Sequence, residues 1–160
     1  MAEKKYLLKR LSAGFYKDYD ADTYPEIEHK GKRPYMVLLV KVGQNTFALP
    51  LRTNIRHNYG YKFKSSDRET SYGTGIDFTK AVVVNDEKYV DEDASINNKE
   101  YIEIDRKAHF IISSFERYLN GYIRYQSNKG TEFDQKRYKY TMLKYFHNEL
   151  GIVQDTSKSI

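Results

Sequence analysis

The alternation of apolar and polar residues predicts a β-rich first part of the chain and a helical end. The clearest pattern is "PYMVLLVKVGQNTFALPL", residues 34–51, in which two apolar runs flank a turn at Gly43-Gln44-Asn45. Two such runs around a short glycine-containing turn are typical of a β-hairpin. Because residues 36–40 are apolar at every position, this strand should be buried on both faces and lie centrally in a sheet. "IDFTKAVVVN", residues 76–85, predicts a third strong strand.

Weaker patterns add further elements. Residues 6–11 form a short apolar and basic run that is typical of a first strand, and Ser12 can cap a short helix after it. A short strand is expected over residues 88–90, and residues 101–104 alternate as a strand should. Residues 54–75 contain three glycines and several serines, so we expect a long surface loop there.

Two amphipathic helices are predicted at the end of the chain, because apolar residues recur there every three or four positions. In the first helix these are Ile111, Phe115, Tyr118, Tyr122 and Tyr125. In the second, after a variant capping box of Thr131 and Asp134, they are Tyr140, Leu143, Phe146 or His147, and Leu150. Strands followed by helices predict an α+β domain: a small, compact, highly curved, mostly antiparallel sheet with peripheral helices, two of them C-terminal.

The composition predicts one domain, residues 1–160, with residues 152–160 as a flexible tail. A chain of 160 residues can bury a core, to which 16 tyrosines and 8 phenylalanines contribute large side chains. The absence of cysteine excludes disulfide scaffolds, zinc ribbons and thiol nucleophiles. No apolar run approaches the roughly 20 residues of a membrane span, and no signal-peptide core is present. We therefore expect a soluble, cytoplasmic protein that needs no cofactor and has no membrane partner.

Charge is unevenly distributed along the chain, whose formal net charge is +5. Both ends are basic and the middle is acidic. From His29 through Ser66 there is no Asp or Glu, although Lys and Arg recur throughout this stretch. A surface of ordinary solubility mixes both signs, so the acid-free stretch predicts part of a binding site for a polyanion.

The stretch "LPLRTNIRHNYGYKFK", residues 49–64, carries the residue types that metal-free RNA cleavage requires. This reaction needs a base for the 2'-OH, groups that stabilise the phosphorane, and an acid for the departing 5'-oxygen. The candidates are Arg52, Thr53, Asn54, Arg56 and His57, together with Lys80. The acidic residues between Asp86 and Asp93 fall in one short connection and are interpreted as solvated side chains, not as a metal site. His109 and His147 are interpreted as packing residues of the helices.

Residue types alone do not decide between cutting RNA and binding it, and they slightly favour binding. The same cations can simply hold phosphates while Tyr59, Tyr61 and Phe63 stack on bases. A noncatalytic RNA-binding module is therefore the alternative to an enzyme. A third class, a protein–protein interaction domain that uses the tyrosine-rich helices, predicts no salt-dependent affinity for RNA.

The stretches "RPYMVLLVKVGQNTFALPLRT", "IRHN" and "GTGIDFTKAVVV" together resemble the endoribonuclease toxins of type III toxin–antitoxin systems, the ToxN/AbiQ/CptN kind. The resemblance implies a barrel-like curved sheet, similar to the Kid/MazF fold, decorated with helices. It also implies RNA cleavage without metal that leaves a 2',3'-cyclic phosphate and a 5'-OH. The implied partner is the toxin's own antitoxin RNA, whose pseudoknot repeats are held in a closed protein–RNA hetero-oligomer. Cellular or phage RNA is the implied substrate, with phage defence or plasmid maintenance as the role.

The resemblance also singles out site residues. The catalytic hydroxyl of the family matches Thr53, and the basic residue before the first hairpin strand matches Arg33. Relatives carry a lysine just after the hydroxyl where this chain has Ile55, so the main cation is left to Arg52, Arg56 or Lys80. The predicted catalytic residues are Thr53, His57, Arg52 and Lys80. The predicted RNA-binding residues are Arg33, Lys32, His29, Asn54, Arg56, Tyr59, Tyr61, Lys62, Lys64, Arg117, Arg124, Lys136 and Arg137.

Overall fold

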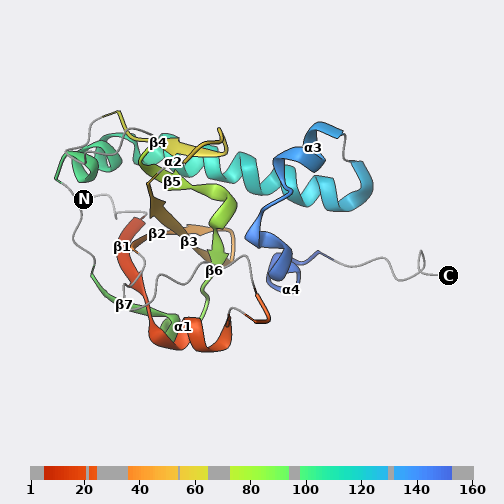
Figure 1. Cartoon of the computed structure of the whole chain (residues 1–160), viewed down its shortest axis with the longest axis horizontal. Helices are drawn as coiled ribbons and strands as arrows, with labels where there is room; N and C mark the ends of the chain where they lie inside the picture. Colours follow the sequence, from red (N-terminus) through yellow and green to blue (C-terminus); the bar gives the residue numbers. More distant parts are fainter. Residues whose placement is uncertain are drawn as a thin grey trace.

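The computed structural model describes residues 6–20, 22–24, 36–53, 55–64, 73–93, 98–129 and 132–152. Within these ranges the chain is α+β, with seven strands in one antiparallel sheet and several helices around it (Figure 1). The strands are β1 (Tyr6–Leu11), β2 (Met36–Val42), β3 (Asn45–Arg52), β4 (Gly60–Lys62), β5 (Gly75–Asp77), β6 (Val82–Val83) and β7 (Val90–Asp93). The α-helices are α1 (Ala13–Asp18), α2 (Asn98–Arg124), α3 (Glu132–Arg137) and α4 (His147–Leu150). A π-helix, η3 (Tyr125–Lys129), extends α2, and the 3-10 helices are η1 (Phe78–Lys80), η2 (Glu87–Tyr89) and η4 (Met142–Tyr145).

The predicted hairpin of β2 and β3 is confirmed and lies at the centre of the sheet, whose strand order is β4-β5-β3-β2-β1-β7 with β6 paired to β3. Its turn contains Gly43 with φ 63°, a left-handed conformation that glycine adopts without strain. Val37 and Leu38 are neighbours in β2 and each is 1% exposed, so both faces of the sheet are covered at this point. The first strand and the short helix after it are also confirmed, with Ser12 accepting a hydrogen bond from the Phe15 amide (3.3 Å).

Helix α2 packs its apolar stripe against the sheet. Ile104, Ile111 and Phe115 are fully buried, and the ring of Phe115 meets that of Phe47 in β3 with centroids 5.0 Å apart. Burying a side chain of this size contributes about 1.5–3 kcal/mol. The strand predicted over residues 101–104 is wrong because α2 begins at Asn98. Ile104 lies two helical turns before Ile111, so both side chains lie on the same face of α2. Burial of this face favours the helix over the strand that the alternation of four residues suggested.

The second predicted C-terminal helix is also wrong, because the chain there forms α3, a turn, η4 and α4 in succession. Tyr138 turns inward at the end of α3, and its hydroxyl donates to the backbone carbonyl of Tyr118 on α2 (2.9 Å). Tyr140, predicted on the buried stripe, is instead 62% exposed, whereas Leu143 and Phe146 are fully buried as expected. The packing of Tyr138 against α2 therefore ends α3, where the apolar stripe predicted one continuous helix.

The stretch 54–75, predicted as a surface loop, contributes β4 and the first residue of β5. Gly60 and Gly75 serve the close approach of these two strands, because a Cβ on Gly75 would overlap the carbonyl oxygen of Tyr61. In a single sequence, glycines that allow strand contact cannot be told from glycines that mark a loop.

The third predicted strand is broken. "IDFTKAVVV" forms β5, then η1, then β6, because the side chain of Asp77 caps η1 by accepting a hydrogen bond from the Thr79 amide (2.9 Å). The short strand expected over residues 88–90 lies one element later: Lys88 belongs to η2, and β7 begins at Val90. An aspartate inside an apolar run was the local signal for the break.

The sheet is not closed into a barrel, contrary to the prediction. Closure would require the end strands β4 and β7 to pair with each other, whereas each pairs on one side only along the described strand order. In Figure 1 helix α2 runs beside β4 and β5 at one end of the molecule, and α1 lies at the opposite end near β7. None of the helices in the described ranges has the length and apolar character that crossing a membrane requires.

Candidate nucleic-acid interface

A groove of about 1120 Å³ lies beside the sheet end that carries β4 and β5. Its walls are the chain that leads from β3 into β4, the start of η1, one face of α2, and the segment that spans the end of α3 and the turn after it. Its cationic lining residues are Arg56, Arg117, Lys136, Arg137 and Lys139. Among the described lining residues there is no Asp or Glu. The groove therefore has the electrostatic character that binds a polyanion.

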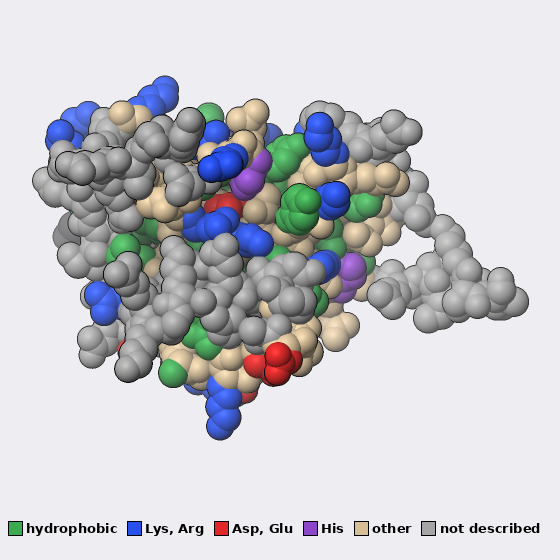
Figure 2. Space-filling view, in the orientation of Figure 1, with side chains coloured by type: hydrophobic (Ala, Val, Ile, Leu, Met, Phe, Trp, Pro, Cys, Tyr) green, Lys and Arg blue, Asp and Glu red, His purple; other side chains and the backbone are tan. Residues whose placement is uncertain are grey.

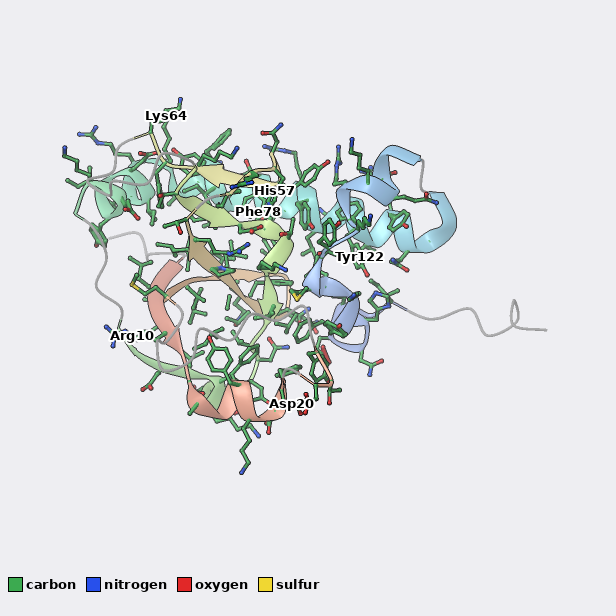
Figure 3. The ribbon with its side chains drawn as sticks, viewed as in Figure 1. Arg10, Asp20, His57, Lys64, Phe78 and Tyr122 are labelled. Atoms are coloured by element: carbon green, nitrogen blue, oxygen red, sulfur yellow. The ribbon has the colours of Figure 1, made fainter. Side chains whose placement is uncertain are left out.

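Helical spacing explains how α2 contributes to this groove. Phe110, Ser114, Arg117 and Tyr118 are separated by four, three and one positions, so they share one face of the helix. The Arg117 guanidinium donates a hydrogen bond to the Ser114 hydroxyl (3.1 Å), which restrains the cation at the groove wall. Figure 2 shows Lys and Arg side chains gathered around a histidine on this face, at the position that Figure 3 labels His57.

Behind the groove lies a fully buried carboxylate, Asp77, at the end of β5. Its Oδ2 accepts a hydrogen bond from Arg52 Nη1 (2.7 Å), and its Oδ1 accepts from His57 Nε2 (3.2 Å) and from the Thr79 hydroxyl (2.6 Å). Burial by itself raises the pKa of Asp77, but hydrogen bonds from His57, Thr79 and Arg52 outweigh it and lower the pKa to about 2. Asp77 therefore stays ionised at neutral pH, and its two carboxylate oxygens orient the side chains of Arg52 and His57.

The hydrogen bonds of His57 define its tautomer. Its Nδ1 accepts a hydrogen bond from the Tyr59 amide (3.0 Å), and an amide N–H can only donate. Nδ1 is therefore the unprotonated nitrogen, and the ring proton on Nε2 is donated to Asp77. The imidazole also stacks on the ring of Tyr59, with centroids 5.5 Å apart and an interplanar angle of 19°. Figure 3 places His57 next to Phe78, at the end of the sheet beside α2.

The proton chemistry available in the groove centres on His57. Histidine is the side chain that exchanges protons near neutral pH, and His57 is the one histidine among the described lining residues. Burial raises the pKa of Tyr118, so its hydroxyl stays protonated at neutral pH. Within the described ranges, no three His, Asp or Glu side chains converge as the ligands of a metal ion would.

The structure brings part of the predicted site together in this groove. The members that line it are His57, Arg56, Tyr59, Arg117, Lys136 and Arg137. Arg52 and Lys80 line a different, small pocket whose other walls are mostly apolar, including Phe15, Val37 and Met142. Thr53 is half-buried in the bend directly after β3 and lines neither space.

Other predicted residues lie away from the groove. Tyr61 is 8% exposed, so it offers no open ring face, and its hydroxyl donates to Glu103 Oε2 on α2 (2.5 Å). Lys64 lies in the same depression as Tyr61, with its amide donating to Glu103 Oε1 (2.9 Å). Lys62 and Arg124 are exposed but do not line the groove. His29, Lys32, Arg33, Asn54, Thr131 and the predicted tail after Ile152 lie outside the described residues.

Sequence reasoning missed several residues of this region, Lys139 among them. Asp77 could have been noticed as a lone carboxylate inside an apolar run, where burial demands a partner. Phe110 and Tyr140 both line the groove. Phe110 was not among the residues of the predicted apolar stripe of the first helix, and Tyr140 was predicted to be buried on the stripe of the second. No signal short of the tertiary structure brings these two rings to the same groove.

Comparison with known proteins adds nothing to this geometry. No protein-family model, curated protein or solved structure matches the chain.

Proposed function

We propose that the chain is a metal-independent endoribonuclease, the toxin of a type III toxin–antitoxin system, and that it binds RNA in the basic groove. The observation that carries this proposal is the groove itself: five cations, no acidic residue among its described lining, and a histidine held by a buried carboxylate on its wall. RNA supplies a phosphate chain for the cations and carries its own nucleophile, the 2'-OH, next to each phosphate.

His57 is assigned the proton transfer. Asp77 accepts a hydrogen bond from Nε2–H and so leaves Nδ1 as the basic nitrogen, in the way that the carboxylate of a catalytic triad orients its histidine. For Nδ1 to take the proton of the 2'-OH, the hydrogen bond that the Tyr59 amide donates to Nδ1 must first break. The 2'-oxygen then attacks the adjacent phosphorus and the bond to the 5'-oxygen breaks. The departing 5'-oxygen takes a proton from a solvent water, and His57 returns the proton on Nδ1 to the solvent. The products are a 2',3'-cyclic phosphate and a 5'-OH.

The other predicted residues receive distinct roles. Arg56 precedes His57 and lines the same groove, so it is the cation assigned to the charge of the phosphorane. Arg52 acts through Asp77 as a positioning residue, because it reaches the carboxylate and lines the other pocket. Thr53 is assigned to position the scissile phosphate on the family resemblance alone. Lys80 receives no step, because it lines the apolar pocket.

The biological setting follows from the resemblance and is part of the same proposal. The enzyme acts in the cytoplasm on cellular or phage RNA, and its fold is a relative of the Kid/MazF sheet. It processes its own antitoxin RNA and is inhibited by the pseudoknot repeats, which it holds in a closed protein–RNA assembly.

Cleavage in the presence of EDTA tests the proposal directly. Purified protein is incubated with mixed RNA and EDTA, and the ends of the fragments are mapped. We expect 2',3'-cyclic phosphate and 5'-OH ends. Fragments with 3'-OH and 5'-phosphate ends, or cleavage that begins only when Mg²⁺ is added, would contradict the mechanism.

His57→Gln tests the assigned base, and His109→Gln is the matched control because His109 is exposed on α2 and does not line the groove. We expect His57→Gln to slow cleavage by about 10²–10⁴-fold, the usual contribution of general acid–base catalysis, with little change in RNA affinity. Equal rates for both variants would remove His57 from the reaction.

One observation favours the alternative, a noncatalytic RNA-binding module. Both ring nitrogens of His57 already have partners within the protein, so a binding role needs no rearrangement. That alternative predicts salt-dependent RNA affinity without cleavage, and induced expression that does not arrest growth.

A further inference from the structure

Two large aromatic rings are exposed inside the basic groove. Phe110 is 54% exposed and Tyr140 is 62% exposed, and both line the groove. Phe110 comes from α2 and Tyr140 from the turn that follows α3, so the two rings stand on different walls. Exposing an aromatic ring forgoes the burial that normally favours it, so exposed rings grouped in one groove indicate contact with a ligand.

Cations line the same groove as the exposed rings. Lys139 Nζ lies over the Tyr140 ring, 5.4 Å from its centre, and Arg117 lies on the same face of α2 as Phe110, two helical turns further along. A ring next to a cation matches one nucleotide of a single strand, whose base offers a flat face and whose phosphate carries the negative charge.

The three rings that the sequence predicted for stacking are already engaged. Tyr61 is buried, and Tyr59 stacks on His57. Phe63 meets Tyr61 edge-on, with centroids 6.0 Å apart, and does not line the groove. Phe110 touches Tyr61 in an edge-on arrangement, with centroids 6.2 Å apart and planes 68° apart, which fixes the position of the ring while leaving about half of it open.

We infer that the groove binds an unpaired RNA strand, with bases stacked on Phe110 and Tyr140 and phosphates held by the neighbouring cations. In a duplex the bases stack on one another and only the end faces are open, so internal bases cannot reach these rings. The two rings therefore make the groove selective for single-stranded RNA. This inference rests on RNA as the ligand of the proposed function but does not depend on cleavage.

The test uses a 2'-O-methyl RNA oligonucleotide, which lacks the nucleophile and so cannot be cut. The strand is about twelve nucleotides long, within the span of known single-strand sites, and carries 2-aminopurine, whose fluorescence falls when it stacks. Its affinity and quenching are measured alone and after annealing to its complement. We expect the intact protein to bind the single strand at least ~10-fold more tightly than the duplex and to quench the probe.

The variants Phe110→Ala and Tyr140→Ala should each weaken single-strand binding by ~10-fold and relieve quenching, while duplex affinity changes little. Phe110→Tyr and Tyr140→Phe keep the rings and should retain both properties. Tyr101→Ala is the matched control, since Tyr101 is an exposed aromatic residue of α2 outside the groove, and it should behave as the unmodified protein. Circular dichroism of each variant establishes that it is folded.

Equal affinity for strand and duplex, or quenching that survives loss of both rings, would overturn the inference. Affinity that falls equally for strand and duplex would also overturn it, because the rings would then support the groove and not the bases. Cleavage of ordinary RNA in EDTA is measured on the same preparations. Cleavage without ring-dependent quenching overturns the stacking inference alone, and quenching without cleavage overturns the proposed enzyme alone.

Discussion

The groove and the small apolar pocket each have one lining residue that contacts Asp77, and they differ in almost every other respect. The groove has a volume of about 1120 Å³ and is lined by cations and aromatic rings. The pocket has a volume of about 30 Å³ and is lined mainly by apolar side chains, with Arg52 and Lys80 among them. His57 reaches Asp77 from the groove and Arg52 reaches it from the pocket. One carboxylate thus separates residues that the sequence had grouped as a single catalytic set.

The surroundings of a positively charged residue decide what it contributes to a site. Arg52 stands beside a buried anion that offsets its charge, whereas the groove cations have no acidic residue among the described lining. A phosphate chain is therefore attracted to the groove and not to the pocket.

Removal of the Asp77 carboxylate should have the largest effect, because it orients one residue of the groove, His57, and one residue of the pocket, Arg52. Asp77→Ala deprives Arg52 and His57 of a buried acceptor and should lower the free energy of unfolding by about 3–5 kcal/mol, measured by urea denaturation. Asp86→Ala is the matched control: Asp86 caps η2 as Asp77 caps η1, but it is exposed, so its loss should cost only about 1 kcal/mol. Similar losses for both variants would mean that Asp77 is only a cap.

Acid should remove part of the stabilisation that the ionised Asp77 carboxylate gives the folded protein. The pKa of Asp77 is about 2 in the folded protein, below its ordinary value of 3.8, so its contribution is complete above about pH 5 and is lost as the pH falls through 2. The loss amounts to about 2 kcal/mol. The stability difference between the unmodified protein and Asp77→Asn, measured by denaturation at several pH values, should shrink by this amount from pH 5 to pH 2. A constant difference over this range would show that the carboxyl is not held ionised by its neighbours.

Changes to single cations should have the smallest effect and distinguish the groove from the rest of the surface. Arg117→Ala should weaken RNA binding by about 5-fold and reduce the slope of log affinity against log salt by about 0.7, the value for one phosphate contact to a single strand. Arg124→Ala, on the same helix but outside the groove, and Lys80→Ala, in the pocket, should leave the slope unchanged. Equal changes in all three variants would mean that binding follows net charge and not the groove.

Local patterns were sufficient for much of the fold. The continuous apolar run of β2, the Gly43 turn and the stripe of Ile111 and Phe115 each reflect contacts that one strand or one helix presents to the core, so short-range periodicity predicts them. Residues 101–104 were mistaken for a strand because four residues are too few to distinguish the two-residue period of a strand from the 3.6-residue period of a helix. The break after Arg137 depends on Tyr138 reaching Tyr118, twenty positions away, and no local pattern carries that contact.

The candidate site divides in the same way. The acid-free stretch from His29 to Ser66 pointed to Arg56 and His57, because charge and residue type are properties of the chain itself. Phe110 was not noticed and Tyr140 was assigned to a buried stripe, because their exposure, and not their residue type, distinguishes them.

By itself, the sequence of this protein determined a basic, cysteine-free α+β chain with a central hairpin and a surface suited to a polyanion. These properties follow from composition and from periodicities of two and 3.6 residues, which act over a few positions. The tertiary structure alone decided that the sheet stays open, that Asp77 contacts both Arg52 and His57, and that four segments of the chain line one groove. The physical reason is that these contacts join residues far apart in the sequence. A buried polar group must have a hydrogen-bond partner, and the packing of the whole core determines which residue comes close enough to be that partner.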